Sequence, residues 1–319
     1  MTRVLVTGAS TPVGIALTHA LLESPLVDCV LAVAADPRPD SFARVAGSRL
    51  VYRVVDLTRA RALHDLLFRE GKDLGVEVIV HNALHRSAWD EGPRIHALNV
   101  ETTRDLLGTA ERHPSIRRFV FRSASAVYHV DPRRSTLLSE DDPLELDPRA
   151  PQKVRDRVEA DLTVCTRMGM SRLEIVVLRC AELLAARVGS QLYDYFASRV
   201  CLRPLGFDPM LNLLSLEDLT HALCLATLGR GSGVFNIPGA DTLPLSRAIE
   251  LWGRTEIPAP GPLLAPLYRW RARVRGMDFR YDLNRRRFHS SAVLDGRRAL
   301  RELGYRPVHP LRWPAGGLD

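Results

Sequence analysis

Lysine is nearly absent from this chain of 319 residues. Only Lys72 and Lys153 occur, so almost all of the 44 basic residues are arginine. An arginine excess of this kind is typical of genome bias and does not by itself indicate a function. Long apolar runs are also missing, and the N-terminus enters its first predicted strand at once. We therefore expect neither a membrane span nor a signal peptide, and we expect a cytoplasmic protein.

Paired cysteines are missing as well. The five cysteines are scattered and contain no C-x-x-C spacing, which favours buried thiols in a reducing compartment over disulfides or zinc ligands. The sequence therefore predicts no metal site. The apolar content of 46% and the charged content of 25% are those of an ordinary globular protein.

The positive charge is concentrated near the C-terminus. Residues 267–312 hold 13 arginines and four acidic residues, a balance of +9, which leaves −2 for the rest of a chain whose total is +7. An acidic partner would meet this segment. We do not expect nucleic acid to be that partner, because aromatic residues are not interleaved with the charges as a stacking surface needs.

The first fourteen residues predict a strand, a tight turn and a helix. An apolar, β-branched run over residues 3–7 stops at Gly8, and Pro12 opens a helical pattern. This order is typical of a dinucleotide-binding turn, in which the helix amides face a phosphate. A βα turn of any α/β protein is the alternative. The candidate cofactor-binding residues here are Gly8, Ser10, Thr11, Pro12, Val13 and Gly14.

The middle glycine of the usual three is missing from this turn. Thr11 stands in its place, and the neighbouring Pro12 has no amide hydrogen for a phosphate. We therefore expect NAD or NADP to bind weakly, or its binding to have been lost.

Strands and helices alternate through the first half of the chain. Apolar runs at 27–35, 50–55, 76–80, 118–122 and 173–178 alternate with helical patterns at 58–69, 89–111 and 151–168. Such alternation predicts a doubly wound parallel sheet of the Rossmann type. We divide the chain into a dinucleotide-binding domain, residues 1–180, and a smaller substrate-type region, residues 181–319, partly interleaved with the first. In the latter, Ser215 and Asp218 predict a helix start, and Asp295 and Gly304 bound a last helix.

Together these landmarks resemble the extended short-chain dehydrogenase/reductase family of the NAD-dependent epimerase/dehydratase type. They include Val-Thr-Gly-Ala at the start, Val55-Asp56-Leu57-Thr58, Val80-His81-Asn82-Ala83, Asn99-Val100, Val127-Tyr128 and Val177-Leu178-Arg179. The resemblance implies that Asp56 and Leu57 hold the adenine and that Asn82 and Ala83 line the middle of the cofactor, with Asn99 among the same site residues.

The choice between NAD and NADP stays open at the end of the second strand. The family's acidic residue is expected near Ala34, whereas Asp36 stands two residues later and Arg38 beyond it. Asp36 would favour NAD and Arg38 would favour a 2′-phosphate. A solvated loop is the alternative for both.

The family's catalytic pair is absent. The resemblance implies a Tyr and a Lys four residues apart on the helix after strand five, but no Tyr-x-x-x-Lys occurs in this sequence. If Glu159 sets the register of that helix, Pro151 takes the tyrosine position and Arg155 the lysine position. Counting back from Tyr128, the usual Ser/Thr position is Ala124. Proline cannot transfer a proton.

Two functions follow from this loss. The first is a nucleotide- or metabolite-binding protein without the usual hydride transfer, a pseudoenzyme. The second is an NAD(P)-dependent reductase, epimerase or dehydratase with substituted acid/base groups, for which His85, Ser125, Tyr128 and His129 are the candidates. A small-molecule ligand, anionic in view of the basic segment, fits either function.

Two surfaces suggest further partners. Val154, Val158, Leu162 and Cys165 form an apolar stripe on the helix that commonly pairs in this family, so we expect a homodimer. In residues 263–275, Leu263, Leu267, Trp270 and Val274 recur at helical spacing among arginines. Such a helix can contact an anionic membrane surface or hold a phosphorylated ligand, or its apolar stripe can be core and its arginines solvated. A protein partner is the remaining possibility.

Overall fold

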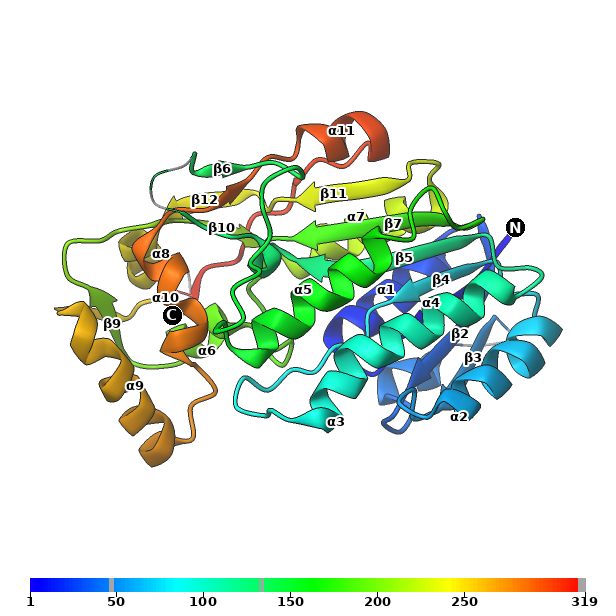
Figure 1. The fold of residues 1–319 in the computed structure, drawn as a ribbon, viewed down its shortest axis with the longest axis horizontal. Coiled ribbons are helices and arrows are strands. Elements are labelled where there is room, and N and C mark those ends of the chain that lie inside the picture. Colours follow the sequence, from blue (N-terminus) through cyan, green and yellow to red (C-terminus); the bar gives the residue numbers. More distant parts are fainter. Residues whose placement is uncertain (46–48, 132, 134, 315–319) are drawn as a thin grey trace.

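The computed structural model describes residues 1–45, 49–131, 133 and 135–314. Its centre is a parallel sheet of seven strands in the order β11-β7-β5-β4-β1-β2-β3 (Figure 1). The strands are β1 (Thr2–Thr7), β2 (Val27–Ala34), β3 (Leu50–Val54), β4 (Val78–His81), β5 (Arg118–Ala124), β7 (Glu174–Cys180) and β11 (Gly233–Ile237). This confirms the predicted doubly wound α/β fold.

Helices cover both faces of this sheet (Figure 1). On one face α1 (Pro12–Glu23) packs against α7 (Leu216–Leu228). On the other lie α2 (Ala60–Asp65), α4 (Thr102–Arg112) and α5 (Gln152–Cys165). Short π-helical segments, η2 (Leu66–Gly71) and η3 (Ala97–Glu101), extend α2 and join α3 (Pro93–His96) to α4. Because both faces of the sheet are covered, its strands are apolar nearly throughout and form two separate cores.

The C-terminal half builds smaller sheets at one end of the large sheet (Figure 1). They pair β8 (Glu182–Leu183), β10 (Met210–Leu214) and β12 (Asp241–Pro244); β9 (Val200–Pro204) and β13 (Thr255–Ala259); and β6 (Leu137–Leu138) and β14 (Val293–Leu294). The helices here are α6 (Gln191–Phe196), α8 (Leu245–Leu251), α9 (Gly261–Arg275), α10 (Tyr281–His289) and α11 (Arg297–Leu303). A third core, rich in aromatic residues, holds this region together. Because β11 enters the large sheet, the two halves of the chain are interleaved.

The predicted helix ends of this region are present. The Ser215 hydroxyl accepts a hydrogen bond from the Asp218 amide at 3.1 Å. Helix α11 begins at Arg297, whose amide donates to Asp295 at 3.0 Å, and it ends at Gly304 with φ of 72°. A residue without a Cβ adopts this left-handed conformation without strain.

A buried polar network joins α5 to β7 and β11. Arg179 forms an ion pair with Asp161 at 2.7 Å, and both side chains are almost fully buried. Asp161 also accepts a hydrogen bond from Ser123 at 2.6 Å. The guanidinium donates to the Tyr128 hydroxyl at 3.2 Å, and that hydroxyl donates to Asn236 at 2.6 Å. The network fixes the position of α5 on the sheet.

The apolar stripe expected at a dimer contact faces mostly inward. Val158 is buried, Val154 and Cys165 pack partly against the two cores, and only Leu162 is exposed. On the outside, α4 and α5 are joined by ion pairs, such as the one between Arg104 and Glu159. The stripe therefore stabilises the monomer, and the homodimer stays a prediction.

The apolar stripe expected on residues 263–275 is exposed, so the alternative in which this stripe is part of the core is wrong. The residues that α9 buries are Leu264, Tyr268 and Arg271, whereas Leu263, Leu267, Trp270 and Val274 are exposed. Both sets have helical spacing, and the sequence pattern could not tell which face meets the protein. No helix in the described part of the chain is long and apolar enough to cross a membrane.

Candidate functional site

A groove runs over the carboxyl ends of the central strands, as expected for an open α/β sheet. Two glycines shape its floor. Gly8 has φ of 64°, and a Cβ there would lie 3.0 Å from the Ala83 backbone. A Cβ on Gly14 would lie 2.2 Å from the Gly8 carbonyl oxygen, so α1 packs against the turn at a distance that only glycine allows. The cavity measures about 440 Å³. It is lined by residues after four neighbouring strands, including Gly8, Ser10, Thr11, Asp36, Asp56, Leu57, Ala83 and His85.

The N-terminus of α1 is capped by its own chain. The Thr11 hydroxyl accepts from the Gly14 amide at 3.1 Å and donates to the Gly8 carbonyl at 2.7 Å. The Asn82 side-chain amide also donates to this hydroxyl, at 3.2 Å. Pro12 is the first residue of the helix and has no amide hydrogen. Among the first backbone amides of α1, the cap uses that of Gly14 and Pro12 has none. The Val13 amide is not bonded by the Thr11 side chain.

Asp36 lines the groove after β2 and accepts a hydrogen bond from Ser10 at 2.7 Å. Arg38 instead donates to the Phe42 carbonyl at 2.7 Å and does not contribute to the lining. The only charge that this loop places on the described groove wall is therefore negative.

Asp56 and Leu57 line the groove beyond β3. The Thr58 hydroxyl donates to Asp56 at 2.6 Å, and this bond is the main reason that the pKa of the carboxyl is lowered. Asp56 is therefore an anion in a fixed orientation at neutral pH.

The middle of the groove is held by buried polar side chains. The Thr7 hydroxyl accepts from the amides of Asn82 and Ala83 at 3.0 and 3.1 Å. Asn99 accepts from the His85 amide at 3.0 Å, which fixes the loop after β4. Burial lowers the pKa of the neighbouring His81 to about 4, so this imidazole is neutral at neutral pH. Asn99 therefore acts on the groove through the loop.

The residues of α5 that face the sheet are not those expected from the register set by Glu159. Arg155 and Glu159 are exposed, and Glu159 pairs with Arg104 on the neighbouring helix. The helix buries two acids, Asp156 and Asp161, and Asp161 stands two residues after Glu159. Counting back from Asp161 in steps of four gives Arg157 and Lys153, both half-buried. The inward positions are thus two residues away from Pro151 and Arg155.

Lys153 bonds to residues of the groove wall and is not itself among the residues that line the groove. Its ammonium donates to the carbonyls of Arg86 and Ser87, at 2.8 and 3.3 Å, and both residues line the groove. Burial, and next to it the cation of Arg157, lowers the pKa of Lys153 to about 8. Burial also lowers the pKa of Arg157, to about 10. Lys153 is therefore the described lysine that changes charge close to neutral pH.

Of the proposed substitute groups, Ser125 and Tyr128 line a second cavity, whereas His85 lines the groove. Tyr128 is buried, and burial raises the pKa of its phenol to about 12 while its hydroxyl serves the Arg179 network. His85 lines the groove and bonds to Asp90 at 2.8 Å. His129 bonds to Glu145 at 3.2 Å, on the side of the second cavity. Ser125 lines that second cavity, next to Ala124 at the end of β5.

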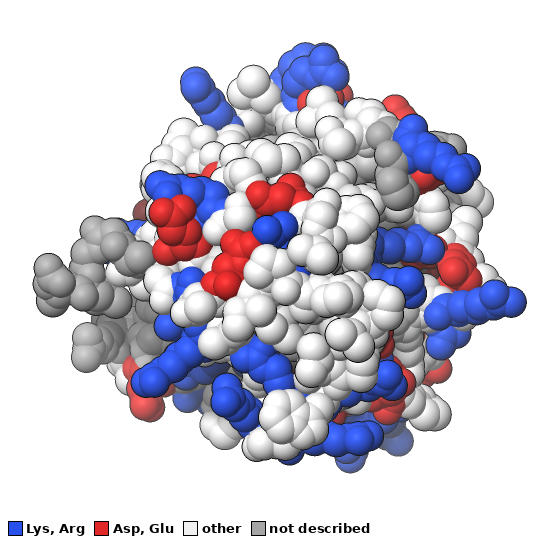
Figure 2. All heavy atoms as spheres, turned by 90° about the vertical axis from the view of Figure 1, so that its left-hand side faces the viewer, with Lys and Arg blue, Asp and Glu red and all other residues white. Residues whose placement is uncertain are grey.

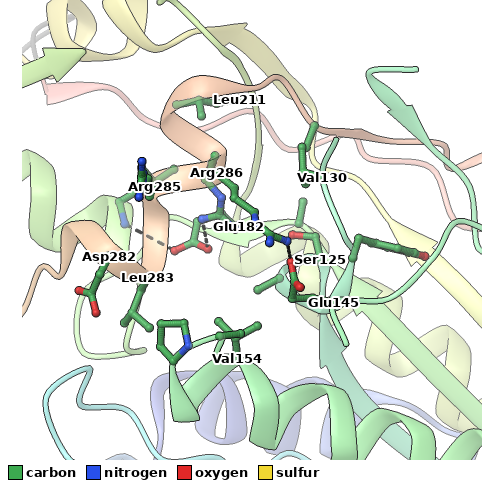
Figure 3. A pocket seen from close by; sticks show the side chains of 18 of the residues that line it. Ser125, Val130, Glu145, Val154, Glu182, Leu211, Asp282, Leu283, Arg285 and Arg286 are labelled. Atoms are coloured by element: carbon green, nitrogen blue, oxygen red, sulfur yellow. Dashed lines mark hydrogen bonds and ion pairs between the residues drawn. The ribbon is translucent and has the colours of Figure 1, made fainter. Parts of the chain in front are cut away.

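The second cavity, about 290 Å³, lies between the end of the sheet and α10 (Figure 3). Glu182 points into it and is held by Arg287 at 2.8 Å and by Ser190 at 2.9 Å. Arg286 pairs with Glu145 across the opening. Pro151 and Val154 bring the start of α5 into the same wall. The cavity thus receives side chains from both halves of the chain.

Two arginines of this cavity have no carboxylate partner. Arg149 and Arg285 contribute to its lining, and in the described residues neither forms an ion pair. Unpaired cations in a partly enclosed site favour an anionic ligand. No group of three metal-ligating side chains was found among residues 1–45, 49–131, 133 and 135–314.

The comparisons with known proteins agree with this architecture. The family model for the NAD-dependent epimerase/dehydratase family matches residues 4–204. An uncharacterized protein of Mycobacterium tuberculosis is 30% identical over 312 residues, which cover 95% of this chain and 80% of that protein.

Solved structures share the fold at lower sequence identity. A dTDP-glucose 4,6-dehydratase of Bacillus anthracis, in complex with NAD, has a TM-score of 0.70 at 17% identity over 97% of this chain and 92% of the other. A UDP-glucose 4-epimerase of Thermotoga maritima, with UDP-glucose, has a TM-score of 0.70 at 14% identity over 96% and 94%. The family model, which matches well over half of the chain, places this protein in the NAD-dependent epimerase/dehydratase family.

Proposed function

We propose that this protein is an NAD-dependent enzyme that acts on a hydroxyl or carbonyl group of an anionic substrate, with Lys153 in place of the family's tyrosine. The observation that carries the proposal is that Lys153 lies on the inward side of α5 and bonds to two carbonyls of the groove wall, next to the residues of α5 that line the second cavity. Arg157 stands four residues later on the same side, as a lysine follows the tyrosine in the family.

The residues that line the groove fit most parts of an NAD molecule. The glycines permit close approach of the backbone, and Asp36 lies where a ribose hydroxyl needs an acceptor. The same carboxylate would repel the 2′-phosphate of NADP. The self-capped start of α1 offers fewer donors to a pyrophosphate, so the affinity is expected to be low for this family. The NAD present in the related dehydratase structure supports the choice of cofactor.

The rarity of lysine supports a chemical role for Lys153. Almost every basic position in this chain is arginine, and arginine cannot lose its proton in a protein. A lysine bonded to the groove wall supplies what arginine cannot, an amine that is neutral in part of the molecules near neutral pH. Burial and the charge of Arg157 both favour that neutral form.

NAD, when bound, accepts or returns a hydride at the carbon that is oxidised or reduced. Lys153 as a neutral amine takes the proton of the substrate hydroxyl, and as an ammonium it returns a proton to the carbonyl oxygen. Ser125 lies in the wall of the substrate cavity and can donate to the same oxygen. Arg149 and Arg285 would hold an acidic group of the substrate, such as the diphosphate of a nucleotide sugar.

A binding protein without turnover is the second candidate. It is favoured by the bonds that Lys153 already makes to two carbonyls, which fit a structural tie between α5 and the loop after β4. It is also favoured by the burial of the Tyr128 phenol.

A screen of nucleotide sugars and other hydroxyl or carbonyl compounds, followed by nicotinamide absorbance, tests the two candidates. We expect turnover with the native protein, and a loss of about a hundredfold to ten-thousandfold in Lys153→Met, the usual contribution of a general acid/base group. The matched control is Arg155→Met, on the exposed side of the same helix. No native turnover, with NAD bound in a titration, would favour the binding protein.

The preference for NAD is tested separately at Asp36. Asp36→Asn removes the negative charge from the adenine end and keeps the shape of the side chain. We expect the ratio of NADP to NAD affinity to rise by about tenfold, or ~1.4 kcal/mol. Fluorescence titration with both reduced cofactors measures it. Asp40→Asn, on the same loop but outside the groove lining, is the control. An unchanged ratio in both variants would contradict the role of Asp36.

A further inference from the structure

Helix α9 carries an apolar stripe that faces away from the protein. Its four members are Leu263, Leu267, Trp270 and Val274, which are 52%, 38%, 61% and 62% exposed. They recur at intervals of four, three and four residues, which places them on one side of a helix of 15 residues, about 22 Å long. Large apolar side chains that are exposed together along one line indicate an interaction surface.

Positive charge accompanies this stripe. Arg269, Arg273 and Arg275 are exposed, and the helix contains no acidic residue from Gly261 to Arg275. Figure 2 shows this end of the molecule, where basic side chains gather in the lower part of the view with uncharged surface between them. A helix with a line of apolar side chains and neighbouring arginines is complementary to a layer with an apolar interior and a negatively charged surface.

The opposite side of α9 is firmly attached to the protein. The Tyr268 hydroxyl accepts from the Leu202 amide at 2.9 Å and donates to its carbonyl at 3.2 Å. Arg271 donates to the Val200 carbonyl at 2.8 Å, and its guanidinium lies over the Tyr268 ring. The helix ends at Gly276 with φ of 64°. The exposed stripe is therefore presented by a fixed scaffold.

We propose that α9 binds the surface of an anionic lipid bilayer, with Trp270 and its apolar neighbours inserted between headgroups and the arginines on the lipid phosphates. Tryptophan is favoured at this depth, since its ring has both apolar and polar parts. A second copy of the chain is a poorer occupant, because a two-fold contact would place the arginines of both copies together. Four partly exposed side chains also fall short of the roughly 800 Å² per partner of a stable protein interface.

Co-sedimentation of the full chain with vesicles tests this proposal. We expect binding to mixed phosphatidylcholine and phosphatidylglycerol vesicles, no binding to phosphatidylcholine alone, and a loss of binding as salt rises. The double variant Arg269→Gln/Arg273→Gln should bind roughly 25-fold more weakly, at about fivefold for each charge. The double variant Leu267→Ala/Trp270→Ala should lose binding to the mixed vesicles. Leu300→Ala/Arg301→Gln, an equally exposed pair on α11, is the matched control.

Circular dichroism confirms that each variant is folded, and sedimentation velocity gives its oligomeric state. Three results would overturn the proposal. They are no binding of the native chain to anionic vesicles at low salt, equal binding by the α9 and α11 variants, and a native oligomer that the Leu267→Ala/Trp270→Ala variant dissociates. The last result would assign the stripe to a contact between copies. None of these outcomes depends on the enzymatic activity.

Discussion

Asp161→Asn is expected to lower the free energy of unfolding by about 3–5 kcal/mol, the usual cost of removing one partner from a buried ion pair. The substitution removes the charge that compensates the Arg179 guanidinium, which stays buried and charged. The pKa of Arg179 is raised above its ordinary value, even though burial opposes this, because Asp161 binds it and attracts it. The guanidinium cannot respond by losing its proton.

Urea unfolding followed by circular dichroism measures this loss. Glu159→Gln is the matched control, because it removes an acid from the same helix whose partner, Arg104, lies in solvent. We expect that control to cost less than about 1 kcal/mol. Equal losses in the two variants would show that the buried pair has no special part in holding α5 on the sheet.

Under the proposed mechanism, the turnover of the native protein is expected to depend on pH through Lys153. Oxidation of a hydroxyl needs the neutral amine, so the rate should rise about tenfold per pH unit below about pH 8 and level off above it. The reduction of a carbonyl needs the ammonium, and its rate should fall over the same range. Lys153→Arg should lose activity by about a hundredfold or more at every pH, since the guanidinium stays protonated.

Arg157→Met separates a chemical role of Lys153 from a structural one. Because the cation of Arg157 lowers the pKa of Lys153, its removal should move the midpoint of the pH profile upward. Arg155→Met, on the exposed side of α5, should leave the midpoint unchanged. Native turnover whose midpoint does not respond to Arg157→Met would contradict the assignment of the titrating group to Lys153.

The order of elements could be predicted from the sequence alone. Apolar runs that alternate with helical patterns indicated a doubly wound parallel sheet, because strands covered on both faces are apolar nearly throughout. Gly8 was expected in the cofactor groove from the strand-turn-helix pattern, and Asp56 from the family resemblance; the parallel topology brings both, with Asp36, to one edge of the sheet.

Only the tertiary structure decided which side of a helix meets the protein. On α5 the sequence offers three acids, Asp156, Glu159 and Asp161, and their spacing does not reveal which of them pairs with a buried arginine on β7. That choice moves the inward pair by two residues, to Lys153 and Arg157. On α9 two sets of residues share helical spacing, and long-range packing on β9 selects Leu264 and Tyr268 for burial. Helical periodicity is a local property, whereas the partner of each side is fixed by contacts between segments far apart in the chain.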